Sequence, residues 1–178
     1  MSFWKNSSQS WAVLAIVIHW VSALAVFGLY VLGWYMVDLD YYDSWYRSAP
    51  FWHKSIGLTL GLVILMRLVL RCVNITPDPF SSQAGWEVAA AKLSHVGLYL
   101  LLLSVFVSGY LISTADGRAI TVFSWFELPA LIVGVDNLED LAGEVHEIAT
   151  DALLVLSMLH AAAAIKHHFI DKDETLLR

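Results

Sequence analysis

The chain has 178 residues, which is the size of one domain. Hydrophobic residues make up 58% of it and charged residues only 15%, so its apolar content is far above that of an average soluble domain. The net charge of −6 argues against a nucleic-acid-binding protein. The single cysteine, Cys72, excludes an intrachain disulfide and an iron–sulfur or zinc–thiolate site. Membrane lipid is the solvent that suits this composition.

Four apolar segments are long enough to cross the hydrocarbon layer, which takes about 20 helical residues. They run over residues 11–36, 51–73, 92–112 and 144–168. Each is expected to be helical, because lipid offers the backbone no hydrogen-bond partners. The first run is too long for the apolar region of a signal peptide and lacks a small-residue cleavage site, so it is interpreted as a membrane span. The pattern predicts a single all-α domain over residues 1–178, an integral membrane four-helix bundle.

The basic residues that flank the spans predict the orientation of the chain. One side of the membrane receives Lys5, Arg67, Arg71, Lys92, Lys166, Lys172 and Arg178. The other side receives Arg47, Lys54 and Arg118. The first side is therefore predicted to be cytoplasmic, with both termini on it. The long connection over residues 114–143 lies on the outer side, and its aromatic patch, residues 123–126, is expected to lie flat on the membrane surface.

Four histidines within the spans form two layers. His146 and His160 are 14 residues apart, nearly four helical turns, so they project from one face about 21 Å apart. His53 lies at the outer start of the second span, at the depth of His146. His19 lies in the first span at the depth of His160. A single histidine in a span often only hydrogen-bonds a neighbouring helix, but two matched layers favour a shared function.

Two neutral imidazoles facing each other across a helix bundle are the axial ligands of a low-spin b haem. The sequence therefore predicts two haems b, one held by His53 and His146 and one by His19 and His160. His95 lies nearer the cytoplasmic edge and is an alternative ligand to His19 or His160. We prefer a role for His95 in binding a quinone or a haem propionate.

Arg67, Arg71 and Lys166 are expected near the cytoplasmic haem, where they would contact its propionates or line a quinone pocket. For at least one of them the simpler explanation is anchoring of the span at the cytoplasmic surface.

With these residues in place, the chain resembles the bacterial cytochrome b561 family over nearly its whole length. The resemblance is carried by His19-Trp20, His53-Lys54-Ser55-Ile56-Gly57, Ser94-His95, His146, His160-Ala161-Ala162-Ala163-Ala164, His167-His168 and Asp173-Glu174-Thr175-Leu176-Leu177. No single motif is diagnostic, but the ordered set is specific. The resemblance implies a dihaem cytochrome of the bacterial inner membrane, with the second helix paired to the fourth and the first to the fourth.

A member of the family is a superoxide oxidase, which passes electrons from superoxide to ubiquinone. The leading hypothesis for this chain is the same oxidoreductase reaction. Superoxide would be drawn to Lys54, with Arg47 or Arg118, and ubiquinone would be reduced near His95 and Arg71.

Two other functions are weighed against it. The first is a cytochrome b subunit that passes electrons from an unknown periplasmic donor to quinone. The second is a transporter or metal permease, against which the unbroken spans and the paired histidines argue.

Overall fold

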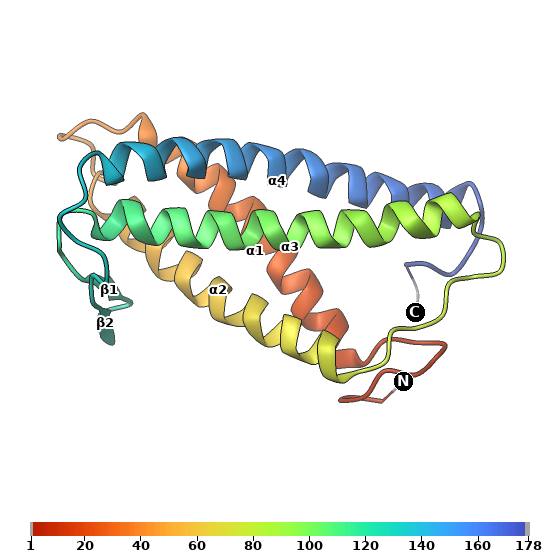
Figure 1. Cartoon of the computed structure of the whole chain (residues 1–178). Coiled ribbons are helices and arrows are strands. Elements are labelled where there is room, and N and C mark those ends of the chain that lie inside the picture. Colours follow the sequence, from red (N-terminus) through yellow and green to blue (C-terminus); the bar gives the residue numbers. More distant parts are fainter. Residues whose placement is uncertain (1, 177–178) are drawn as a thin grey trace.

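A computed structural model of the chain describes residues 2–176. Leu177, from the family motif, and Arg178, from the predicted cytoplasmic basic residues, lie outside the described residues. Within that range the structure has four long helices and one short hairpin (Figure 1). The elements are α1 (Val13–Val37), α2 (Ser48–Val73), α3 (Gly85–Thr114), β1 (Ile120–Val122), β2 (Phe126–Leu128) and α4 (Leu138–Phe169). Each of the four helices is long and apolar enough to cross a membrane. The predicted all-α membrane bundle is confirmed.

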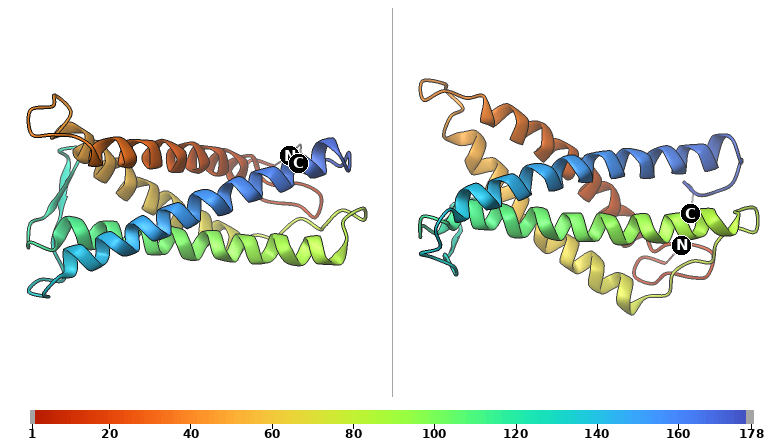
Figure 2. Two further views of the ribbon diagram at one scale, coloured as in Figure 1. Left: turned by 90° about the horizontal axis from the view of Figure 1, so that it is seen from above. Right: turned by 45° about the horizontal axis from the view of Figure 1, so that its top comes forward.

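The helices pack as two pairs, α1 against α2 and α3 against α4. Figure 2 shows that α4 crosses the bundle obliquely. A buried apolar layer lies at mid-length, made of Leu60, Ile64, Leu102 and Leu153. Most of the remaining helix surface is apolar and exposed, as at Leu24 and Trp34, whose exposed fraction is 72% each. In a membrane this surface faces lipid.

The two ends of the bundle differ. The N- and C-terminal segments lie at one end, which we call the terminal end (Figures 1 and 2). The other end carries β1 and β2, and we call it the hairpin end. Two of the helices begin more than one turn before the predicted apolar spans, α3 at Gly85 rather than near residue 92, and α4 at Leu138 rather than near residue 144. The extra turns carry the acidic residues Glu87, Glu139 and Asp140, and at the start of α3 the Glu87 carboxylate accepts the Ala84 N–H at 2.9 Å.

The hairpin gives the aromatic patch of the long connection a definite shape. Thr121 on β1 pairs with Glu127 on β2. Phe123 and Ser124 have positive φ angles of 47° and 60°, as a tight hairpin turn requires. The Phe123 N–H donates to the Ser55 hydroxyl at 3.1 Å, so the hairpin is fixed to α2. The patch is therefore a turn docked on the hairpin end of the bundle.

Candidate functional site

The predicted outer histidines face each other at the hairpin end. His53 on α2 and His146 on α4 are both half-buried, with ring centroids 6.4 Å apart and planes inclined by 69°. Glycines of the other two helices lie against them. A Cβ at Gly33 of α1 would lie 3.2 Å from His53 Cε1, and a Cβ at Gly109 of α3 would lie 3.0 Å from His146 Cε1. All four helices therefore surround this pair, and α1 and α3 each place a glycine against one of the two rings.

Hydrogen bonds to α3 set the orientation of the His146 ring. Its Nδ1 lies 3.1 Å from the Val105 carbonyl oxygen and 3.0 Å from the Ser108 hydroxyl. A carbonyl can only accept, so Nδ1 carries the proton and donates it. The other ring nitrogen, Nε2, then keeps its lone pair. This is the state in which a histidine ligates a metal while a second partner fixes the ring.

Three histidines meet at the predicted inner layer, toward the terminal end. His19 of α1 and His160 of α4 have ring centroids 6.3 Å apart with planes inclined by 87°. His95 of α3 lies closer to His160, at 5.3 Å. Among the described residues, His19 Nδ1 is buried without a hydrogen-bond partner. A buried polar atom of this kind indicates that a ligand completes the site.

The ring spacings discriminate between these histidines. Two imidazoles that bind one iron from opposite sides must keep a fixed distance. The distance from the metal to each ring centroid is the metal–nitrogen bond, about 2 Å, plus the ring radius, roughly 1.2 Å. The centroids are then about 6.4 Å apart. The His53–His146 and His19–His160 pairs fit this distance, at 6.4 Å and 6.3 Å. The His95–His160 distance of 5.3 Å is too short.

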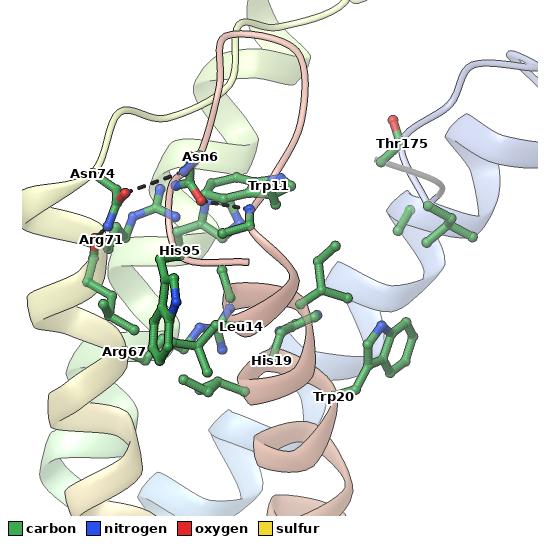
Figure 3. A pocket seen from close by; sticks show the side chains of 18 of the residues that line it. Asn6, Trp11, Leu14, His19, Trp20, Arg67, Arg71, Asn74, His95 and Thr175 are labelled. Carbon is green, nitrogen blue, oxygen red and sulfur yellow. Dashed lines mark hydrogen bonds between the residues drawn. The ribbon is translucent and has the colours of Figure 1, made fainter. Parts of the chain in front are cut away.

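A cavity of about 400 Å³ opens beside the inner histidines. Figure 3 shows His19, His95, Arg67 and Arg71 around it. The N-terminal segment covers one side through Trp4, Asn6 and Trp11, and the C-terminal residues Thr175 and Leu176 also line it. The residues before α1 were not anticipated as part of a site, because interfacial tryptophans are common at the ends of membrane spans.

Hydrogen bonds hold the N-terminal segment in place. The Asn6 side chain donates to the Ile75 carbonyl at 2.8 Å, and the Asp78 N–H donates to the Ser8 carbonyl at 2.8 Å. The Arg71 guanidinium lies 5.9 Å from the Trp11 ring centroid, a distance typical of a cation–π contact. The cover over the cavity is therefore an ordered part of the fold.

Lys166 is not brought to this cavity. Its amino group lies 2.7 Å from both the Glu87 and the Asp171 carboxylates. This ion pair lowers the pKa of Asp171 below its usual value. Lys166 therefore joins α3 to the C-terminal tail, whereas Arg67 and Arg71 line the cavity as expected.

The basic residues at the hairpin end differ in exposure and in whether an acidic partner compensates their charge. Lys54 follows His53 on α2, is half-buried, and has no ion-pair partner within residues 2–176. Arg47 immediately precedes α2 and is exposed. Arg118 is 85% exposed and is paired with Asp116, whose pKa it lowers. The charge of Arg118 is thus compensated, while that of Lys54 is not.

Known proteins share this sequence over its length. A sequence model described as prokaryotic cytochrome b561 matches residues 10–178. "Cytochrome b561 homolog 2" of Escherichia coli K12 is 44% identical over 178 residues, which covers 100% of this chain and 94% of that protein. "Cytochrome b561 homolog 1" of the same strain is 26% identical, with 92% of each chain covered. "Probable superoxide oxidase CybB" of Yersinia pestis is 28% identical, with 96% of this chain and 95% of that protein covered.

These matches account for the long apolar helices and the buried imidazoles together. The chain belongs to the prokaryotic cytochrome b561 family of bacterial membrane proteins, which bind haem b and transfer electrons through the membrane.

Proposed function

We propose that the chain holds two haems b and oxidises superoxide at the hairpin end while reducing ubiquinone at the terminal end. His53 and His146 would hold the iron of one haem, and His19 and His160 that of the other. The supporting observation is the pair of imidazole layers, each with the centroid spacing that one iron requires. When bound, the two haems supply a one-electron path between the ends of the bundle. The hairpin end is periplasmic, and both termini are on the cytoplasmic side of the inner membrane.

At the hairpin end, Lys54 attracts the superoxide anion. Its uncompensated charge lies next to His53 in the chain, while many nearby outer residues are acidic. Arg47 precedes Lys54 by seven residues, about two helical turns, so the two residues lie on the same side of α2. Arg47 therefore extends the positively charged surface toward solvent. Such a local field raises the encounter rate of an anion even when the net charge is negative.

At the terminal end, the 400 Å³ cavity receives the quinone head group. Its volume is within the range of small-molecule sites. Arg71 and His95, which line the cavity, would offer hydrogen-bond donors to the quinone oxygens, while Arg67 would offer its guanidinium to the propionates of the inner haem. Two superoxide anions, one ubiquinone and two protons then give two molecules of oxygen and one ubiquinol.

The test is the visible spectrum of the oxidised, purified protein. A pulse of superoxide is expected to produce the bands of reduced b haem within the mixing time, and added ubiquinone is expected to abolish them. Haem bands that do not respond to superoxide would contradict the proposed donor. Protein that binds no haem when expressed with ample haem supply would contradict the whole proposal.

Replacing Lys54 with Glu is expected to slow the reduction by superoxide about tenfold at low salt, because an attractive charge becomes a repulsive one. The difference should shrink as ionic strength rises. Stopped-flow absorbance measures the rate. Arg118→Glu is the matched control, because the charge of Arg118 is already paired with Asp116 and its replacement should matter much less. Equal rates in the two variants would exclude steering by Lys54.

A second function is favoured by the hairpin turn. Trp125 is 80% exposed, and its ring centroid lies 5.3 Å from that of Phe123. The Phe123 ring in turn lies 5.9 Å from that of Trp52, the neighbour of His53. This exposed aromatic surface suits a periplasmic redox protein, which would make the chain an electron-transfer subunit between that donor and quinone. This function would be supported over the first if a periplasmic donor reduced the haem and superoxide did not. The reduction by that donor should then be lost in the Trp125→Ser variant.

A further inference from the structure

A cluster of ionisable side chains lies at the terminal end, away from the paired histidines. Glu87 comes from the first turn of α3, His167 from the last turn of α4, and Asp171 and Asp173 from the C-terminal tail. His167 Nδ1 lies 2.8 Å from Asp171 Oδ2 and 3.7 Å from Asp173 Oδ2. Glu87, His167 and Asp171 can each offer one ligand atom, with all three atoms within 4.8 Å of one another.

Two buried atoms of this cluster lack hydrogen bonds among the described residues. Asp173 Oδ2 is one of them, on a side chain that is only 5% exposed. His167 Nδ1 is the other, although Asp171 Oδ2 lies only 2.8 Å from it. Buried polar atoms are rarely left unpaired. Two of them 3.7 Å apart indicate a missing common partner.

Lys166 does not supply that partner. Its ammonium group bonds to Glu87 and Asp171 and is 41% exposed. The Thr175 N–H donates to the other oxygen of the Asp173 carboxylate, Oδ1, at 2.9 Å. The cluster thus holds three carboxylates and one lysine, which pairs with two of them, and it has an excess of negative charge while the imidazole is neutral. A further cation would balance it.

We propose that Glu87, His167, Asp171 and Asp173 bind one divalent transition-metal ion such as Zn²⁺. Two metal–ligand bonds of about 2.0–2.2 Å that meet at tetrahedral or octahedral angles place their ligand atoms roughly 3–3.5 Å apart. The observed separations of 2.8 Å and 3.7 Å need only small adjustments to reach this range. The imidazole favours zinc and its neighbours over magnesium or calcium, which prefer all-oxygen sites. Lys166, on a flexible stem, moves aside when the ion binds.

The ion would join three parts of the chain. It connects the start of α3, the end of α4 and the tail, and the tail residues Thr175 and Leu176 line the 400 Å³ cavity. Metal binding therefore fixes the segment that closes one side of the cavity. This role does not depend on the proposed electron donor or acceptor.

The experiment uses the full-length, haem-loaded protein in detergent, stripped of loose metal with a chelator. Equilibrium dialysis against Zn²⁺ is expected to show one tight site per chain. His167→Gln should weaken that site at least tenfold, about the effect expected for loss of a ligand interaction. The matched control is His168→Gln, which changes the adjacent histidine outside the cluster and should leave the affinity unchanged. Lys166→Met removes the competing cation and should tighten binding.

A second readout reports on the tail itself. Lys172 is exposed and lies between the two tail aspartates, so trypsin can cleave after it. Zn²⁺ should slow this cleavage severalfold in the unmodified protein and in His168→Gln, but not in His167→Gln. The proposal is overturned if no zinc binds, or if the His167 and His168 variants bind and cleave alike. Either result would mean that the cluster is an ion-pair network only.

Discussion

Replacing His146 with Ala is expected to lower the haem content of the purified protein from the proposed two per chain to about one. The remaining imidazole, His53, would face an empty position 6.4 Å from its ring centre and could not hold the iron from both sides. The other haem should remain, because the apolar layer around Leu60 and Leu153 separates the sites, and His146 and His160 are about 21 Å apart along α4. The pyridine haemochrome assay, set against protein concentration, measures the stoichiometry.

Alanine variants of the other histidines test which pair holds which haem. His53→Ala should lose the same haem as His146→Ala, whereas His19→Ala and His160→Ala should lose the other one. His95→Ala should retain both, since its spacing from His160 is too short to span an iron. Loss of a haem in His95→Ala with retention in His19→Ala would instead make His95 the ligand. Unchanged stoichiometry in all five variants would contradict the ligand assignment, provided circular dichroism shows that they are folded.

Much of the fold follows from the sequence because lipid imposes one solution. An apolar stretch of about 20 residues must be a helix, and four such stretches must form a bundle. The depths of the histidines follow from the constant helical rise, so the meeting of His53 with His146 and of His19 with His160 could be predicted. The structure adds their spacing, which separates His19 from His95 where the order of residues along the chain left both open.

Features that depend on contacts between distant segments could not be predicted. Lys166 follows His160 in the chain and so was expected near the inner cavity, but Glu87, from a turn of α3 outside the apolar span, pairs with it. The hairpin has strands of three residues each, too short for an alternating pattern to stand out. The N-terminal cover of the cavity depends on contacts with the loop after α2, such as the bond from the Asn6 side chain to the Ile75 carbonyl.

The glycines illustrate the same limit most clearly. A glycine in a membrane helix usually marks close helix packing, and nothing in the sequence distinguishes Gly109 from Gly28. In the structure, Gly28 has no atom within 4 Å of an added Cβ, while Gly109 faces the His146 ring. Only the packing of α3 against α4 makes one of them part of the site.

Gly109→Ala is therefore expected to weaken the binding of the outer haem by at least about tenfold, the effect seen when the support of a metal ligand is lost. The new methyl group would lie 3.0 Å from His146 Cε1 and 3.3 Å from Nδ1, so the ring must move. Movement breaks the bond from Nδ1 to the Val105 carbonyl and turns Nε2 away from the position opposite His53. Titration of haem into the apoprotein, followed by absorbance, measures the affinity of each site.

Gly28→Ala is the matched control, because it makes the same chemical change within a membrane helix where space is open. It should leave both haem affinities unchanged and, since alanine favours helix more than glycine does, should not lower the thermal stability. A general loss of stability in Gly109→Ala would affect both haems, whereas a local displacement of His146 affects only the outer one. If the two alanine variants bind haem equally well, the His146 ring does not depend on the space that Gly109 leaves, and the outer site must be wider than the contacts of α3 and α4 indicate.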